Sequence, residues 1–284
     1  MRDRLRTVRH ALPKVLERIA RGPGPEAAAR RCRILNRSGI AATVGYFHAE
    51  DEKPDDIVAA TLAVARLVAA QPGDVYLSLK APPLQFSAQR IARIAQEAAK
   101  GRLGLMFDAH ALRDAEPTLE LASSLARDFP DVGVVLPARW RRSGADAGCF
   151  RDTSARIRVV KGEWADPDWT GADVETNYLS VIARLSGRAA PVSVATHDPG
   201  LAERALRLLL AADTPCELEQ LRGLPSRRTT AIARRLGVRI RTYVPFGPGW
   251  WPYALDKALD RPHLLSWMVK DRFGASRALV PQPN

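Results

Sequence analysis

Eight short apolar runs recur along this chain, and a longer amphipathic stretch separates each run from the next. Short runs of this kind predict β-strands, and longer stretches with one apolar face predict helices. Strands that alternate with helices pair in parallel, because the chain must cross back over the sheet between them. A count of eight favours a (βα)8 barrel over an open doubly wound sheet.

The predicted strands cover 40–46, 75–79, 103–107, 132–136, 157–160, 192–195, 216–218 and 238–243. The predicted helices cover 54–70, 87–99, 116–127, 173–185, 200–211, 225–236 and 250–273. Residues 138–152 are the poorest helix candidate, because Gly144 and Gly148 lie inside that stretch. No glycine-rich phosphate loop follows the first strand, although an open nucleotide-binding sheet would usually show one.

The length of the chain suits one barrel, because 284 residues with 46% hydrophobic content can bury a single large core. We expect residues 39–284 to form this barrel. Residues 1–38 are rich in arginine, and we expect a basic helical segment there that packs outside the barrel. The predicted fold class is therefore α/β, a (βα)8 barrel of the TIM type with N-terminal helices on its outside.

The formal net charge of the chain is +12, and arginines crowd its N-terminal part. A basic arm can bind nucleic acid or anionic lipid, but no nucleic-acid-binding module accompanies this one. A solvated, arginine-rich helix face is the interpretation we favour. We expect no nucleic-acid partner; contact with a membrane would be peripheral, at its inner face.

The three cysteines, Cys32, Cys149 and Cys216, lie far apart and lack the spacing of metal ligands. This pattern predicts free thiols in a reducing compartment. No apolar run is long enough to span a bilayer. We therefore expect a cytoplasmic protein without a resident metal.

The active site of a (βα)8 barrel lies at the carboxyl ends of its strands. Many of the residues that this rule selects are ionisable. Ionisable side chains are expected in a functional site and are unusual where residues only pack in a core. The selected residues are Glu50, Lys80, Asp108, 137–139, Lys161, His197, Glu219 and Tyr243.

Residues 239–247 contain Tyr243, Pro245 and Gly247, and an aromatic helical stretch follows at 250–262. This segment resembles the last strand and last helix of the flavin-dependent proline dehydrogenase family, in its monofunctional bacterial form. The resemblance extends over residues 40–275. It implies the barrel fold, an FAD cofactor and oxidation of an amine.

The helix at 250–273 carries the clearest departure from that family. Tyr253, Asp256, Lys257 and Asp260 share one helical face by their spacing. The family has two adjacent arginines that grip the carboxylate of proline where this chain has Asp256 and Lys257. Neither residue reproduces a bidentate guanidinium clamp, so we expect a substrate amine or amino acid other than plain proline.

The family's flavin-contacting motifs have counterparts here. Residues 157–162 resemble the end of its fifth strand, with Trp164 in place of a tyrosine, and 195–198 resemble its Ala-Thr-His-Asn. A cation near the N1/N5 side of a flavin favours its reduced form. The resemblance implies a cofactor set of Arg158, Val160, Lys161, Gly162, Trp164, Ala195, Thr196, His197 and Asp198.

Lys80 and Asp108 each follow a predicted strand directly. The family has a lysine and an aspartate at these places, beside the substrate and under the flavin. We expect an ion pair that keeps both groups charged. The alternatives are a lysine that snorkels from a strand end and an aspartate that caps the next helix.

The resemblance assigns Lys80, Asp108, Arg158 and Tyr243 to catalysis. It assigns substrate binding to Lys80, Asp108, Tyr243, Tyr253, Asp256, Lys257 and Asp260. Glu219 falls where the family has glutamine, and the sequence leaves its role open.

The leading hypothesis is hydride transfer from the carbon next to an amine nitrogen to flavin N5, giving an imine. Quinone or oxygen would then reoxidise the flavin. A true proline dehydrogenase is the second hypothesis. The third is a barrel without cofactor that acts as a binding protein, which Pro137, Gly171 and Asp198 favour because they depart from the family. A metal-dependent hydrolase is the weakest, because only His48 and His197 lie near strand ends.

Overall fold

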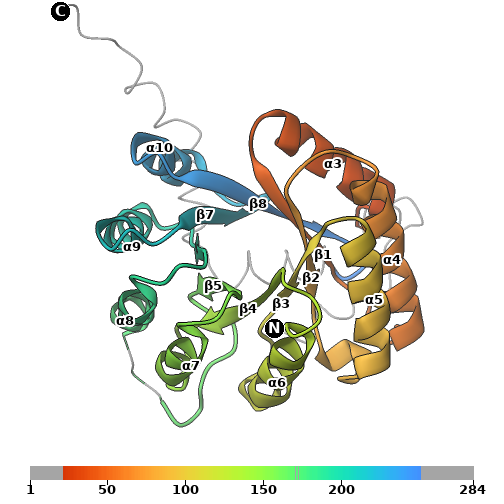
Figure 1. Cartoon of the computed structure of the whole chain (residues 1–284), viewed down its shortest axis with the longest axis horizontal. Helices are drawn as coiled ribbons and strands as arrows, with labels where there is room; N and C mark the ends of the chain where they lie inside the picture. Colours follow the sequence, from red (N-terminus) through yellow and green to blue (C-terminus); the bar gives the residue numbers. More distant parts are fainter. Residues whose placement is uncertain (1–21, 170, 172, 251–284) are drawn as a thin grey trace, which may run out of the picture.

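The computed structural model describes residues 22–169, 171 and 173–250, which form a closed barrel of eight parallel strands (Figure 1). The strands follow one another in chain order, and the last returns to pair with the first. Their bounds are β1 Ala41–Tyr46, β2 Val75–Leu79, β3 Gly104–Phe107, β4 Val132–Pro137, β5 Arg156–Val160, β6 Val192–Ala195, β7 Cys216–Leu221 and β8 Arg239–Phe246. The predicted barrel is confirmed.

The last two strands run three residues further than predicted. β8 continues through Pro245, although proline cannot donate a hydrogen bond to a ladder. In the structure Pro245 pairs in register with Gly45, and the ladder continues as the amide of Phe47 donates to the carbonyl of Phe246 at 2.8 Å. Glu219 and Tyr243 therefore lie within β7 and β8 and not at their ends.

Helices cover the outside of the barrel between consecutive strands (Figure 1). They are α4 Pro54–Ala69, α5 Ala88–Lys100, α6 Ala115–Leu125, α7 Ser143–Phe150, α8 Val174–Leu185, α9 Pro199–Ala211 and α10 Arg227–Arg235, with short 3-10 turns η1 Pro82–Leu84 and η2 Leu112–Asp114. The helix predicted at 250–273 lies outside the described residues, apart from its first residue.

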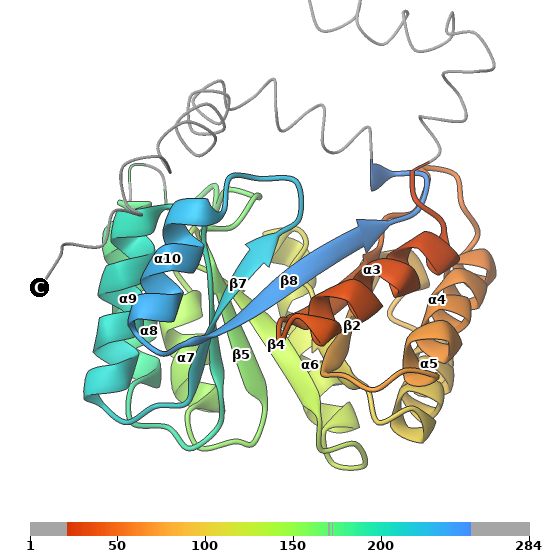
Figure 2. The ribbon, with the colours of Figure 1, turned by 90° about the horizontal axis from the view of Figure 1, so that it is seen from above.

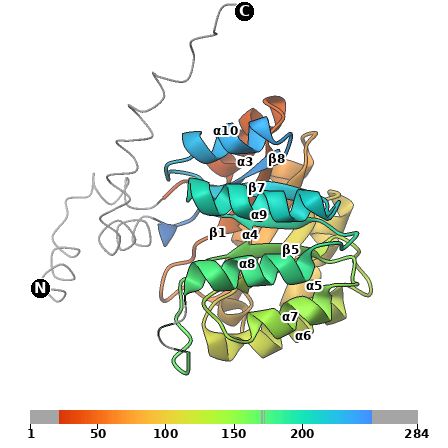
Figure 3. The same cartoon turned by 90° about the vertical axis from the view of Figure 1, so that its left-hand side faces the viewer.

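The doubtful stretch at 138–152 contains a real but short helix, α7. The hydroxyl of Ser143 donates to the carbonyl of Pro137 at 2.7 Å, and Arg142 pairs with Asp146 one turn later. These contacts hold the first turn in place despite two glycines in the helix. Figure 3 shows α7, α8, α9 and α10 side by side along one flank of the barrel.

A helix that precedes the first strand, α3 Pro25–Arg37, packs against α4, β1 and β8 (Figure 2). It buries Ala28, Ala29, Cys32 and Leu35. It thereby covers the part of the barrel wall where β8 meets β1. Residues 1–21 lie outside the described part, and the division into 1–38 and 39–284 stays a prediction.

The apolar core lies between the strands and the surrounding helices. Outward-facing residues of the strands, such as Val44, Leu77 and Val194, form it together with the inner faces of the helices. A smaller apolar cluster is formed by Tyr76, Met106 and Val135, with Ala109 and Val160 packed against it. Among the described helices, none has both the length and the apolar character needed to cross a membrane.

Candidate active site

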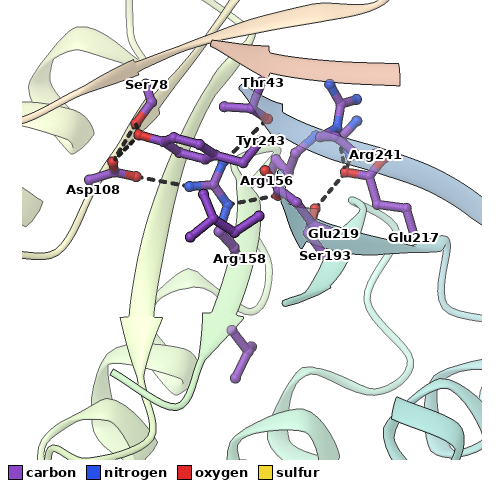
Figure 4. Close-up of polar contacts among 12 residues, drawn as sticks. Thr43, Ser78, Asp108, Arg156, Arg158, Ser193, Glu217, Glu219, Arg241 and Tyr243 are labelled. Carbon is purple, nitrogen blue, oxygen red and sulfur yellow. Dashed lines mark hydrogen bonds and ion pairs between the residues drawn. The ribbon is translucent and has the colours of Figure 1, made fainter. Parts of the chain in front are cut away.

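Charged side chains fill much of the interior of this barrel, where barrels usually hold aliphatic residues. Alternate residues of a strand face the same side, so Arg156 and Arg158 of β5 and Glu217 and Glu219 of β7 all point inward. Arg158 is 4% exposed and Glu219 is 2% exposed. Charges buried this deeply require partners, and Figure 4 shows the contacts that supply them.

Four of these charges form what we call the mouth cluster: Lys80, Asp108, Arg158 and Glu219. Arg158 lies between the two carboxylates, with Nη1 2.8 Å from Asp108 Oδ1 and Nε 2.7 Å from Glu219 Oε2. Lys80 Nζ lies 3.5 Å from Asp108 Oδ2. The predicted Lys80–Asp108 pair is therefore present, and Arg158 extends it across the barrel.

Hydroxyl groups complete the coordination of the mouth cluster. Asp108 Oδ2 accepts hydrogen bonds from Ser78 and, at 3.0 Å, from the hydroxyl of Tyr243. Thr43 Oγ1 accepts from Arg158 Nη2 at 3.3 Å. Asp108 thus has a donor at each of its oxygens, which fixes the orientation of the carboxylate.

Tyr243 reaches Asp108 only because Gly45, on the neighbouring strand β1, has no side chain. A Cβ on Gly45 would lie 1.9 Å from the hydroxyl oxygen of Tyr243. The ring of Phe47 lies next to it, with ring centroids 6.3 Å apart, and the ammonium of Lys80 lies 4.2 Å from the centroid of Phe47. Lys80 is consequently held between a carboxylate and an aromatic ring.

The electrostatics of the cluster follow from burial and pairing. Burial alone would raise the pKa of Asp108, but Lys80 and Arg158, with the bonds from Ser78 and Tyr243, hold it below its ordinary value. Burial lowers the pKa of Lys80, and Asp108 opposes this only in part. Pairing therefore favours the charged form of Asp108, whereas burial works against the charged form of Lys80.

Tyr243 and Arg158 keep their protons. Burial and the nearby Asp108 raise the pKa of Tyr243 well above its ordinary value, so its hydroxyl remains a donor. Burial opposes the charge of Arg158, but the carboxylates of Glu219 and Asp108 outweigh it and raise the pKa of the guanidinium. Arg158 is consequently a fixed positive charge.

A second group of charges lies deeper in the barrel, and we call it the floor cluster: Asp74, Arg156, Glu217 and Arg241. Arg241 donates to Glu217 Oε1 and to Asp74 Oδ1, each at 2.8 Å. Arg156 Nη1 also lies 2.8 Å from Glu217 Oε1. This cluster lies toward the amino ends of the strands, where structural rather than catalytic roles are usual.

The residues of the predicted cofactor set come together because β5 pairs with β6, with Val160 opposite Ala195. Lys161 Nζ lies 3.2 Å from Glu175 and 3.5 Å from Asp198. Gly162 has a φ of +88°, and a Cβ there would lie 2.8 Å from Pro137 Cβ. Only glycine fits this place without strain.

Trp164 and the 195–198 segment complete that surface. Trp164 is 45% exposed, and its ring stacks on His110 with centroids 5.2 Å apart. Asp198 caps α9, accepting from the amides of Gly200 and Leu201. Its own amide donates to Thr196 Oγ1 at 3.1 Å. The departure from asparagine at 198 therefore preserves a helix cap.

His197 connects two loops of the mouth. Its Nδ1 lies 2.8 Å from the carbonyl of Pro225, and its Nε2 accepts from the amide of Leu221 at 3.0 Å. Together these bonds select the neutral tautomer with a proton on Nδ1. A flavin contact through this ring stays a prediction.

The site differs from the sequence prediction in several respects. Asp108 does not cap the next helix, because α6 begins after Asp114. Glu219, whose role the sequence left open, is a buried partner of Arg158. Ser78 and Thr43 were missed, although alternation would have placed Ser78 on the same face as Lys80.

The predicted substrate residues Tyr253, Asp256, Lys257 and Asp260 lie outside the described residues. Glu50 is exposed and joins neither cluster.

In the part of the chain that the structure describes, no group of three or more histidine, cysteine, aspartate or glutamate side chains could hold a metal ion. The cysteines Cys32, Cys149 and Cys216 are free.

No family model matches the chain. It is 27% identical over 271 residues to proline dehydrogenase 1 of Bacillus subtilis subsp. natto, and the match covers 89% of each protein. It is 26% identical over 290 residues to the proline dehydrogenase of Deinococcus radiodurans, with 92% of this chain and 91% of that protein covered.

Among solved structures, proline utilization A (PutA) from Bdellovibrio bacteriovorus matches with a TM-score of 0.75 at 17% identity. The match covers 90% of this chain and 33% of the other, so this chain spans about a third of the length of that protein. PutA from Corynebacterium freiburgense matches with a TM-score of 0.67 at 16% identity, over 94% of this chain and 34% of the other. These likenesses show the barrel fold.

Proposed function

We propose that this chain is a proline dehydrogenase-like oxidoreductase, as its similarity to proteins named proline dehydrogenase supports. The proposed reaction is the FAD-dependent oxidation of the carbon–nitrogen bond of proline to a cyclic imine. The observation that carries it is the buried Lys80–Asp108–Arg158 arrangement at the mouth of the barrel. Relatives named proline dehydrogenase favour proline, which was the second hypothesis from the sequence, over another amine.

The residues at the carboxyl ends of β5 and β6 fit an anionic aromatic cofactor. Arg158 and Lys161 supply positive charge, and Thr196 and the backbone at Gly162 supply polar contacts. FAD bound there would contribute a two-electron acceptor. The proposed cofactor residues are Arg158, Val160, Lys161, Gly162, Trp164, Ala195, Thr196, His197 and Asp198.

Within this proposal Arg158 and Lys80 of the mouth cluster have different tasks. Arg158 places a fixed charge against the cofactor, because its orientation is set by Asp108, Glu219 and Thr43. Lys80 contacts Asp108 and the carbonyl of Tyr46 at 3.2 Å, which leaves its third N–H for a substrate carboxylate. The substrate amine must be unprotonated to release a hydride, and the positive charges of Lys80 and Arg158 nearby disfavour its protonated form.

A second candidate is oxidation of an amine or amino acid other than proline. The observation in its favour is the sequence at 256–257, where Asp256 and Lys257 stand in place of two arginines that bind a carboxylate in the family. Loss of a bidentate clamp weakens carboxylate binding, and an aspartate there favours a cationic group.

The electron acceptor in this proposal is a quinone or oxygen, and quinone reduction would involve peripheral contact with a membrane. The basic residues before the barrel would provide that contact. The rate at which reduced flavin is reoxidised by vesicles that contain a quinone, compared with its rate of reoxidation in oxygenated buffer, separates the two acceptors.

The test is the visible absorption spectrum of the purified protein, recorded anaerobically before and after proline is added. A flavin spectrum that bleaches supports proline oxidation. A flavin spectrum that persists with proline and bleaches with another amine supports the second candidate. A protein that neither contains nor takes up FAD contradicts both and leaves a barrel that only binds its partners.

Two matched variants place the reaction in the mouth cluster. Lys80→Met removes the buried ammonium beside Asp108, whereas Lys100→Met removes an exposed ammonium at the end of α5. Bleaching should slow at least about tenfold in the first variant, about 1.4 kcal/mol in activation free energy. It should be unchanged in the second. Equal rates in both would remove Lys80 from the reaction.

A further inference from the structure

Glu219 is a buried carboxylate with one unsatisfied oxygen. The residue is 2% exposed, and its Oε2 accepts from Arg158 Nε at 2.7 Å. Its Oε1 is buried and has no hydrogen-bond partner. Burial of a neutral side chain at this position would cost less free energy than burial of a carboxylate. The presence of a carboxylate here therefore needs an explanation.

The charge of Glu219 changes the balance of the mouth cluster. Lys80 and Arg158 are its cations, and Asp108 and Glu219 are its anions, so the four side chains are neutral as a group when all are ionised. With glutamine at position 219, the same group would carry one positive charge. A single buried charge acts strongly on nearby groups, because the surroundings screen it poorly.

We propose that Glu219 is a positioning residue that holds Arg158 in place and offsets its charge, so that the bound flavin is harder to reduce. This inference rests on the proposed function, because it requires a flavin at Arg158. Hydride uptake makes the flavin anionic, and a negative charge nearby disfavours that form. The flavin of this chain would thereby have a lower reduction potential than the flavin of a family member with glutamine at this position.

The variant Glu219→Gln isolates the charge. Glutamine has nearly the same shape, and its amide oxygen can still accept from Arg158 Nε. Arg158 also keeps its contacts with Asp108 and Thr43. Glu219→Asp is the complementary variant, because it keeps the charge and shortens the side chain by one methylene.

Glu217→Gln is the matched control. Glu217 lies on the same strand, two residues closer to its amino end, and is equally buried, at 2% exposure. It pairs with Arg241 and Arg156 in the floor cluster and not with Arg158. Two residues of strand put it about 6.6 Å further from the mouth.

The experiment measures the reduction potential of the flavin in each purified, FAD-loaded protein. The protein is reduced anaerobically in equilibrium with a redox dye of known potential, and absorption spectra give the ratio of reduced to oxidised flavin. We expect E219Q to raise the ratio of reduced to oxidised flavin at least about tenfold at a given potential, which is about 30 mV for a two-electron couple. E219D should stay within about threefold of the wild type, and E217Q should match it.

Two results would overturn the inference: a ratio for E219Q equal to that of the wild type, or a shift in E219D as large as that in E219Q. If E219Q does not accumulate as folded holoprotein, Glu219→Ser removes the same charge and takes its place with the same expected shift. A wild-type protein that takes up no flavin refutes the proposed function itself, whereas a flavin whose potential ignores Glu219 refutes this inference alone.

Discussion

Arg158 and Asp108 face each other across the interior of the barrel, with Nη1 of the arginine 2.8 Å from Oδ1 of the aspartate. They stand 50 residues apart in sequence, and β4 separates their strands. Each is also bound to a second charge, Glu219 and Lys80 respectively. A change in any one of the four therefore leaves another buried charge without its full set of partners.

Asp108→Asn should destabilise the protein markedly. The variant leaves Lys80 and Arg158 with less compensating charge in a buried place, and breaking such a pair costs roughly 3–5 kcal/mol. Urea unfolding of the cofactor-free protein measures the loss. Asp55→Asn, which removes an exposed partner of Arg90, is the control and should leave the midpoint almost unchanged. Similar midpoints for the two variants would contradict the role assigned to Asp108.

The stability of the protein should fall as the pH drops below about 4. The pKa values of Asp108 and Glu217 are held below their ordinary values in the folded state. As these carboxyls begin to titrate, near pH 4, the unfolded chain therefore binds more protons than the folded one. The contribution of the two carboxylates to the free energy of unfolding is fully present above that pH and decreases below it. Unfolding free energies at a series of pH values test this, and Asp108→Asn should show a shallower decrease.

Tyr243→Phe should lower both the activity and the stability of the protein. The change removes a hydroxyl that donates to Asp108 and lies 3.1 Å from Ser78, so the carboxylate loses part of its orientation. We expect kcat/KM to fall about tenfold or more, with a loss of stability of about 1.5–3 kcal/mol.

Tyr178→Phe provides the comparison for this prediction. The hydroxyl of Tyr178 is fully buried on α8 and donates to the carbonyl of Val159 at 2.8 Å, outside the barrel interior. It should lose about 1 kcal/mol of stability and retain its activity. Equal activities in the two variants would show that the Tyr243 hydroxyl has no part in the reaction.

Gly45→Ala should displace Tyr243. The new methyl carbon would lie 1.9 Å from the hydroxyl oxygen, so the ring must move away from Asp108. We expect lower stability and a loss of activity at least as large as in Tyr243→Phe. Gly148→Ala in α7 meets nothing within 4 Å and should stabilise the protein by about 0.5–1 kcal/mol. Full activity in Gly45→Ala would be incompatible with this packing.

Gly162→Ala should weaken flavin retention. A Cβ at this position meets Pro137 and is strained by a φ of +88°. Gly237→Ala carries a comparable strain, with a φ of +69°, but lies between α10 and β8 with nothing within 4 Å. Flavin content after gel filtration should drop for Gly162→Ala and stay near the wild-type content for Gly237→Ala. Equal retention in both would place the cofactor elsewhere.

The order of the elements was readable from the chain because periodicity is local. β2 and β6 match their predicted bounds, and α7 was the doubtful helix because its glycines hide the pattern. The ends of β7 and β8 were predicted three residues too early. Ladder partners on the neighbouring strands keep both segments extended, and no local pattern records those partners.

The sequence by itself determined the barrel class and the residues near the carboxyl ends of the strands, because strand alternation and chain order decide these. Only the tertiary structure decided which charges meet. The sequence left the role of Glu219 open, and closure of the barrel turns it inward onto Arg158. The reason is physical: a buried charge must find its partner in three dimensions, and the partners come from strands that only the closed sheet brings together.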